Sequence, residues 1–190
     1  VFWDIGANVG SYSVYAAKFK NCKTFAFEPS VFNLELLARN ININNLEKLI
    51  TIISTPLSKY NNIDYFSMTD TTNGGALSSF AYEYDQDGNI LKSIFKYKTN
   101  GSNAYDLLKF YNLDFPEYIK IDVDGAEFLI IDGFNKKLLI NTKEILIEIN
   151  EKVTGQFTKI NNILINYGYK LDSKYYFDDT SQFNGIWKKK

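Results

Sequence analysis

The sequence predicts an α/β fold built on a doubly wound, Rossmann-like sheet that is mostly parallel, and three observations support this. Residues 1–10, VFWDIGANVG, run from a short apolar strand into a glycine-rich turn. Apolar runs and segments of helical periodicity then alternate through residue 53, as expected for parallel strands joined by right-handed crossovers. A second short strand, residues 24–27, ends at Glu28, which completes a nucleotide-binding half of such a sheet.

Each of the first two predicted helices has a serine at its start, a residue type that caps helix N-termini. These serines are Ser11 and Ser30. A β-branched run over residues 49–53 predicts the third strand. Apolar residues at helical spacing mark the expected buried faces: Tyr12, Tyr15, Ala16 and Phe19 in the first helix, and Leu34, Leu37, Ala38 and Ile41 in the second.

The alternation breaks over residues 60–100, a stretch rich in Tyr, Phe, Ser and Thr. Turn signals occur at Asn73-Gly74-Gly75 and at Asp87-Gly88. We therefore expect an insertion of antiparallel hairpins in this region.

The second half of the chain returns to the alternating pattern and completes a predicted sheet of seven strands. The last two strands are expected to close it as an antiparallel pair. The whole chain, residues 1–190, is expected to form one domain, preceded by a segment upstream of the first strand. The predicted elements are helices at 103–111, 128–131 and around 160–167, and strands at 118–121, 144–149, 169–177 and 183–189.

Composition excludes several classes of function. The net charge is −1, the only arginine is Arg39, and the pI is about 5.6, which argues against a nucleic-acid partner. The absence of histidine removes the commonest general base and metal ligand. Cys22 is the only cysteine, so no disulfide is expected and a reducing cytoplasm fits. No apolar run reaches the roughly 20 residues that span a bilayer, so we expect no membrane insertion.

The glycine-rich turn has the spacing G-x-N-x-G, at Gly6, Asn8 and Gly10, and differs from the dinucleotide fingerprint G-x-G-x-x-G. Asp4 stands two residues before it, where a carboxylate would repel a pyrophosphate but suit an ammonium or sulfonium group. Glu28 is placed to accept hydrogen bonds from ribose hydroxyls. S-adenosylmethionine carries both cationic groups and no phosphate, so it is the expected cofactor.

A second group of carboxylates follows the predicted strand 118–121, across the point where strand order reverses. Asp122 and Asp124 are the predicted catalytic residues, because a chain without histidine must use a carboxylate, a lysine or a tyrosine to accept a proton. A divalent metal bridging Asp122, Asp124 and Asn150 is an alternative mechanism, although no metal is included in the favoured prediction.

Four segments, DIGANVGSYSVYAA, FAFEPS, KIDVDGAE and ILIEIN, resemble in order and spacing the FkbM-type branch of class I S-adenosylmethionine-dependent methyltransferases. The resemblance covers residues 1–150 and implies a sheet of the class I methyltransferase type. It implies that Asp122 lies next to the transferable methyl group. It further implies that Asp4, Gly6, Asn8 and Gly10 hold the methionine part, Glu28 the ribose, and Thr55, Pro56, Leu57 and Ser58 the adenine.

The resemblance also implies a substrate class. Family members are mostly O-methyltransferases that act on sugars, glycan precursors or small natural products, with acceptor specificity expected in the 60–100 insertion. The alternatives are an NAD-dependent oxidoreductase, a nucleic-acid methyltransferase and a binding protein without activity. The turn spacing and Asp4 disfavour the first, and the near-neutral charge disfavours the second.

Overall fold

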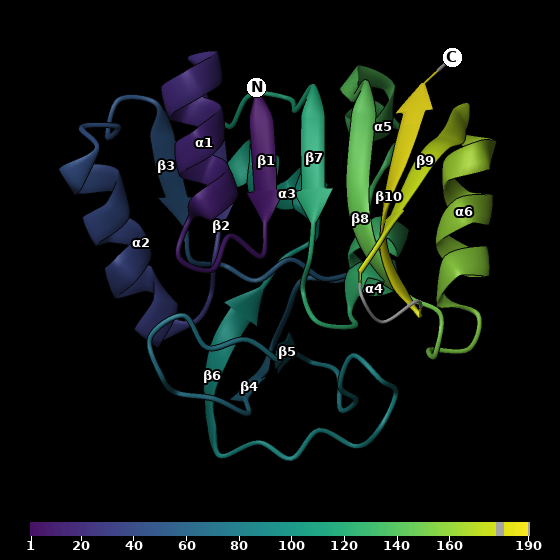
Figure 1. Cartoon of the computed structure of the whole chain (residues 1–190), viewed down its shortest axis with the longest axis horizontal. Helices are drawn as coiled ribbons and strands as arrows, with labels where there is room; N and C mark the ends of the chain where they lie inside the picture. The colour runs from purple at the N-terminus through teal and green to yellow at the C-terminus, as the bar shows by residue number, and fades with distance from the viewer. Residues whose placement is uncertain (178–180, 190) are drawn as a thin grey trace.

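The computed structural model describes residues 1–177 and 181–189 and contains the expected seven-stranded sheet, in the order β3-β2-β1-β7-β8-β10-β9 (Figure 1). Strands β3, β2, β1, β7 and β8 pair in parallel, and β10 runs antiparallel to β8 and β9. Strand order reverses between β1 and β7, where doubly wound sheets bind ligands. The strands are β1 Phe2–Ile5, β2 Thr24–Phe27, β3 Ile50–Ile53, β7 Tyr118–Ile121, β8 Glu144–Asn150, β9 Tyr169–Tyr176 and β10 Gln182–Lys189.

Helices cover both faces of this sheet. The larger core contains Trp3 and Ile5 of β1 together with residues of four helices on one face. A smaller core, around Ala26 and Leu37, lies under the other two helices. Asp4, between Trp3 and Ile5, therefore faces the second side. The helices are α1 Ser11–Lys20 and α2 Val31–Ile43 on that side, and α3 Ala104–Phe110, α4 Glu127–Asp132, α5 Lys136–Asn141 and α6 Gln156–Asn166 over the larger core.

Within the part of the chain that the structure describes, all five predicted helices are present, and one further helix was not predicted. The Ser30 hydroxyl caps α2 as predicted and accepts a hydrogen bond from the Asn33 amide at 3.4 Å. The helix that was not predicted is α5, a six-residue helix that Asn135 caps. No described helix combines the length and apolar character that crossing a membrane requires.

The buried face of α1 is not the one that the aromatic residues predicted. Tyr12, Tyr15 and Phe19 are 49%, 55% and 67% exposed, whereas Ser13 and Ala17 are buried. Small side chains on the inner face let the helix lie close to the sheet. The cap also differs from the prediction, because the N-cap residue is a glycine, Gly10, in the left-handed region (φ 87°).

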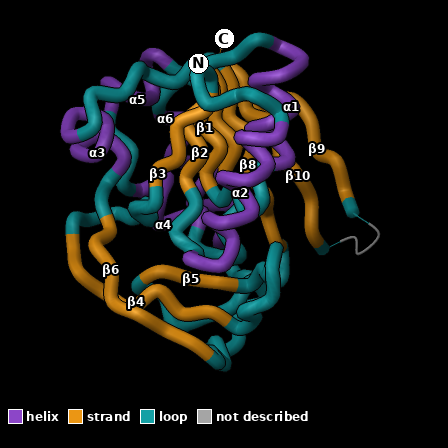
Figure 2. The backbone as a smooth tube through the Cα atoms, turned by 90° about the vertical axis from the view of Figure 1, so that its left-hand side faces the viewer, coloured by secondary structure: helices purple, strands orange, loops and turns teal. Residues whose placement is uncertain are grey.

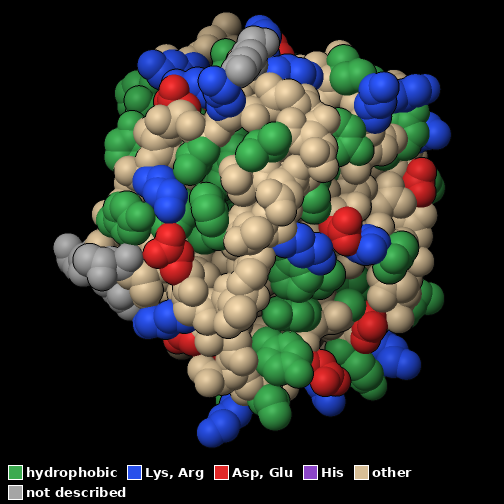
Figure 3. All heavy atoms as spheres, turned by 90° about the vertical axis from the view of Figure 1, so that its right-hand side faces the viewer, with side chains coloured by type: hydrophobic (Ala, Val, Ile, Leu, Met, Phe, Trp, Pro, Cys, Tyr) green, Lys and Arg blue, Asp and Glu red, His purple; other side chains and the backbone are tan. Residues whose placement is uncertain are grey.

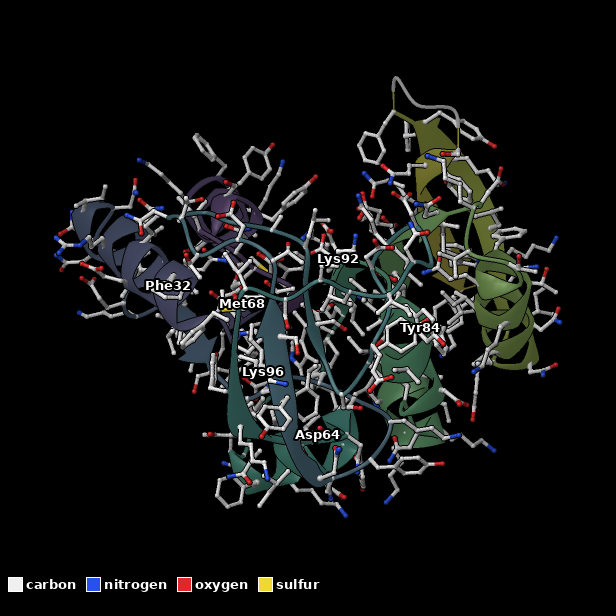
Figure 4. The ribbon with its side chains drawn as sticks, turned by 90° about the horizontal axis from the view of Figure 1, so that it is seen from below. Phe32, Asp64, Met68, Tyr84, Lys92 and Lys96 are labelled. Atoms are coloured by element: carbon white, nitrogen blue, oxygen red, sulfur yellow. The ribbon has the colours of Figure 1, made fainter. Side chains whose placement is uncertain are left out.

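The insertion between β3 and α3 forms a second, antiparallel sheet, as predicted, with strand order β5-β4-β6. Its strands are β4 Asn62–Met68, β5 Ser78–Phe80 and β6 Phe95–Gly101. It lies below the carboxyl ends of the parallel strands (Figures 1 and 2). Phe32 of α2 packs against a small core formed by Phe66, Met68 and Phe80 (Figure 4). The insertion is thereby anchored beside the site where the central strands end.

The packing of α1 can be tested with two substitutions. Ala17→Leu should lower the free energy of unfolding by about 1–3 kcal/mol, because it overpacks a closely fitted contact. Phe19→Ala should change it by less than about 0.5 kcal/mol, because the ring is mostly exposed. Urea unfolding followed by circular dichroism measures both changes. A larger loss of unfolding free energy for Phe19→Ala than for Ala17→Leu would indicate that the aromatic face of α1 is the buried one, as the sequence predicted.

Candidate functional site

A pocket opens at the carboxyl ends of β1, β2 and β7, with a volume of about 180 Å³. Three chain segments form its walls: the glycine-rich turn after β1, the segment after β2, and the loop after β7. The insertion supplies the fourth wall. The lining residues are Gly6, Asn8, Glu28, Pro29, Asn33, Phe66, Gly75, Ala76, Ser78, Asp122, Val123 and Asp124.

The turn after β1 depends on the first glycine. Gly6 has a φ of +77°, and a Cβ there would lie 1.8 Å from the carbonyl oxygen of Asp122. No side chain fits this approach, so Gly6 lets the turn press against the end of β7. Asn8, also left-handed at φ 49°, lines the pocket beside it. Gly10 does not line the pocket. A Cβ there would meet the Leu37 side chain at 2.5 Å, so this glycine shapes the turn from behind.

Asp4 lies beneath the turn and does not line the pocket. Its carboxylate is fully buried; it accepts a hydrogen bond from the Ser13 hydroxyl at 2.6 Å and lies 3.5 Å from the Lys120 ammonium. Burial raises the pKa of Asp4 in spite of these partners. The sequence predicted Asp4 as a contact of the cofactor, and the structure places it one layer deeper, as a support for the turn.

Lys120, in β7, is a residue that sequence reasoning missed. Its ammonium lies 3.1 Å from the Asp122 carboxylate, donates to the Gly6 carbonyl at 3.2 Å and sits 4.9 Å from the ring of Tyr12. Burial works to lower the pKa of Lys120, but the charges of Asp4 and Asp122 outweigh it and raise the pKa. Lys120 therefore stays charged. The sequence signal that could have identified Lys120 is a lysine within the strand YIKI, whose other residues are apolar or aromatic.

Glu28 closes the pocket at the end of β2, where the sequence placed it. One carboxylate oxygen accepts the Asn8 amide at 2.8 Å and the other accepts the Ser30 amide at 2.7 Å. Burial raises its pKa to about 7, although both hydrogen bonds oppose this. The carboxylate thus joins the glycine-rich turn to the start of α2 and presents its remaining lone pairs to the pocket.

The two predicted catalytic carboxylates differ in their surroundings. Asp122 lines the pocket with a side chain that is 38% exposed. Asp124, at φ 58°, accepts the amides of Leu77 and Ser78 at 2.7 and 3.2 Å. Burial and the neighbouring charge of Asp122 raise the pKa of Asp124 to about 6. Asp124 holds the insertion in place, which leaves Asp122 as the more accessible carboxylate.

The insertion closes the pocket through further backbone contacts. The Asn33 side chain donates to the Gly75 carbonyl and accepts from the Gly74 amide, both at 3.0 Å. Asn8 donates to the Gly74 carbonyl at 3.2 Å. These three hydrogen bonds hold the turn at Gly74 and Gly75 against the glycine-rich turn and α2.

The segment expected to contact adenine is divided between cavities. Leu57 is buried and lines a small cavity of about 40 Å³ that shares Gly6 and Val123 with the main pocket region. Thr55 instead lines a separate open cavity beside α3. Leu57 therefore lies within reach of an extended pocket, whereas Thr55 points elsewhere.

The residues of the metal alternative do not converge. The Asn150 amide donates to the Gln86 carbonyl and to Asp87, at 2.8 and 2.9 Å. Within residues 1–177 and 181–189, no three His, Cys, Asp or Glu side chains gather closely enough to hold a metal ion. Glu127 is fully buried and accepts the amides of Val123 and Gly125, both at 3.1 Å, so it shapes the loop after β7.

A family profile described as "Methyltransferase FkbM domain" matches residues 4–171, most of the chain. The chain belongs to the FkbM methyltransferase domain family. This membership confirms the resemblance seen in the motifs and implies S-adenosyl-L-methionine as the cofactor. None of the curated proteins compared with the chain matches it.

Solved structures show the same fold. The FkbM methyltransferase of Methylobacillus flagellatus KT aligns over 98% of this chain and 42% of its own, with a TM-score of 0.68 and 13% identity. A precorrin-6y C5,15-methyltransferase of Geobacter metallireducens GS-15 aligns over 100% of this chain and 79% of its own, with a TM-score of 0.55 and 16% identity. TrmK of M. capricolum, solved with S-adenosyl-homocysteine, aligns over 99% of this chain and 61% of its own, with a TM-score of 0.54 and 13% identity. The chain thus spans under half of the FkbM structure.

The buried ion pairs of this FkbM domain yield a prediction. Lys120→Met should lower the free energy of unfolding at pH 7 by about 3–5 kcal/mol, because it leaves Asp4 buried and unpaired. The loss should shrink as the pH falls, since a carboxyl whose folded pKa is raised regains stability when it is protonated. Urea unfolding at several pH values measures this.

Lys23→Met is the matched control, because Lys23 pairs with Asp114 at 2.6 Å and both side chains are 53% exposed. It should cost no more than about 1 kcal/mol at any pH. Equal losses for the two variants would contradict a special role for Lys120.

Proposed function

We propose that this FkbM domain is an S-adenosylmethionine-dependent methyltransferase that transfers a methyl group to a hydroxyl oxygen. The observation that carries the proposal is the position of Asp122. Its half-exposed carboxylate lies in the same pocket as the glycine-rich turn and Glu28. A proton acceptor thus stands beside a site suited to a nucleoside.

The pocket residues fit the proposed cofactor. Glu28 would bind the ribose hydroxyls, Gly6 and Asn8 the methionine part, and Leu57 the adenine side, while Asp4 and Gly10 support the turn from behind. Ser78 gives an independent sign of a missing polar partner. Its hydroxyl lines the pocket, is buried, and has no hydrogen-bond partner among the described residues. Buried polar atoms rarely stay unpaired.

When bound, S-adenosylmethionine supplies an electrophilic methyl carbon, and the electron pair of the broken C–S bond leaves on sulfur as a neutral thioether. The new bond forms between that carbon and the acceptor oxygen, so the enzyme chiefly has to align the two. Asp122 orients the hydroxyl and takes its proton. Asp124 holds the 74–78 loop beside the pocket by accepting the amides of Leu77 and Ser78.

We propose a sugar, a glycan precursor or a small natural product as the acceptor. Two aromatic rings of the insertion support this class. Tyr82 packs edge-on against Phe128 of α4, with ring centroids 5.5 Å apart. It also contacts Tyr84, which is labelled in Figure 4 and is 45% exposed. Such rings offer a flat apolar surface beside the loop after β7. Tyr97, by contrast, fills the small core of the insertion.

The surface favours a neutral acceptor over a nucleic acid. Lysines and carboxylates are interspersed on the face around the β9–β10 edge (Figure 3). The total charge of −1 offers no excess of cations for a polyanion. A dinucleotide is also disfavoured, because the carboxylates that line the pocket would repel its pyrophosphate.

Ligand choice can be tested by thermal shift. S-adenosylhomocysteine at about 100 times its Kd should raise the Tm by roughly 5–10 °C, and NAD should leave it unchanged. Glu28→Gln should reduce the shift, because an amide is a poorer acceptor for ribose hydroxyls, whereas Glu47→Gln on the surface should retain it. Stabilisation by NAD alone would favour the oxidoreductase alternative.

The role of Asp122 can be tested by kinetics. Asp122→Asn should lower the rate of methyl transfer by about 10²- to 10⁴-fold and leave the affinity for S-adenosylhomocysteine within a few-fold. The assay follows labelled methyl from S-adenosylmethionine to hydroxylated sugars and glycan precursors. Equal losses of binding and turnover, or no loss of either, would remove Asp122 from the reaction.

A further inference from the structure

A second carboxyl group lies beside Asp122, on the neighbouring strand. The register of β7 and β8 pairs Ile121 with Ile147, so the next residues, Asp122 and Glu148, stand side by side where the strands end. Ile121 and Ile147 both pack in the larger core, so the side chains that follow them both project toward the other face of the sheet. Two carboxylates held side by side repel each other when both are charged, which favours a proton on one of them. Glu148 has no part in the reaction as described above.

The charges around this pair set where the proton lies. Lys120 contacts Asp122 at 3.1 Å and so favours the negative charge on that carboxylate. Beyond the end of β7, Asp124 and Glu127 act on Glu148 as like charges. Asn184 of β10, opposite Glu148, is neutral. The proton therefore belongs on Glu148.

The electrostatics agree with this assignment. Burial and then the adjacent charge of Asp122 raise the pKa of Glu148 to about 8. A carboxyl group of this kind is protonated at neutral pH, and a cation placed nearby makes it release the proton. Asp122 is the partner that borders the pocket. A cation bound there would lie next to Asp122 and would act on the pKa of Glu148 through that carboxylate.

We propose that Asp122 and Glu148 form a proton-sharing pair that releases its proton when a sulfonium ligand binds beside Asp122 and regains one when that positive charge is lost. This inference rests on the proposed function. Glu148 acts through Asp122 and is a positioning residue. With the pair doubly ionised, the acceptor hydroxyl gives its proton to the pair as its oxygen takes the methyl group. The sulfonium charge disappears in the same step, so the total charge stays constant.

Proton release on binding tests the proposal without any acceptor. Titration calorimetry in two buffers of different protonation enthalpy, near pH 7.5, gives the number of protons released with S-adenosylmethionine and with S-adenosylhomocysteine. The wild type should release more protons with the sulfonium ligand, by up to about one. In Glu148→Gln this excess should fall sharply. Protons released by the ligands' own amino groups contribute equally in the wild type and in the variant, so they cancel when the two excesses are compared.

Glu144→Gln is the matched control, because Glu144 lies on the same strand and the same face but pairs with Lys188 at 3.9 Å. It should keep the wild-type excess. An unchanged excess in Glu148→Gln, or an equal loss in Glu144→Gln, would overturn the proposal.

A second measurement needs no variant. Infrared difference spectra of the wild type should show the carbonyl stretch of a protonated carboxylic acid with S-adenosylhomocysteine and its loss with S-adenosylmethionine. A band that is the same with both ligands overturns the proton-sharing pair but leaves the methyltransferase function standing. A wild-type protein that binds neither ligand overturns the proposed function itself, and this inference with it.

Discussion

The buried ammonium group of Lys120 is the constraint on which the rest of the site depends. It lies between Asp4 on β1 and Asp122 after β7, and it also holds the Gly6 carbonyl. Without it, the Asp4 carboxylate would stand buried and uncompensated within the sheet, which costs several kcal/mol. One cation thereby fixes the glycine-rich turn and the Asp122 carboxylate. In the proposed function, ligand binding and chemistry would depend on this single support.

The insertion completes a pocket that the parallel sheet alone leaves open. Its 74–78 loop forms hydrogen bonds with Asn8, Asn33 and Asp124, one residue from each of three different parts of the site. Every one of these bonds uses loop backbone, so the closure depends on shape more than on the side chains of the loop. Side-chain substitutions in this loop that leave its backbone path intact should therefore preserve these hydrogen bonds.

Local patterns predicted the strands and the carboxyl-end position of the site, because β-branched runs and glycine-rich turns act over a few residues. The face of α1 was predicted wrongly because its contact with the sheet is made by Ser13 and Ala17, which carry little hydrophobic signal. Lys120 and Ser78 were missed for another reason. Their roles arise from partners far away in the chain, and no local pattern contains that information.

The charge argument that first pointed to a sulfonium ligand holds, but on different residues. Asp4 was expected to supply the negative charge, yet Lys120 neutralises it beneath the turn. The carboxylates that line the pocket are Glu28, Asp122 and Asp124, and its described lining contains no lysine or arginine. Such a pocket repels phosphates and attracts a cation. The preference therefore belongs to the carboxylates that follow β2 and β7, and not to Asp4 beneath the turn.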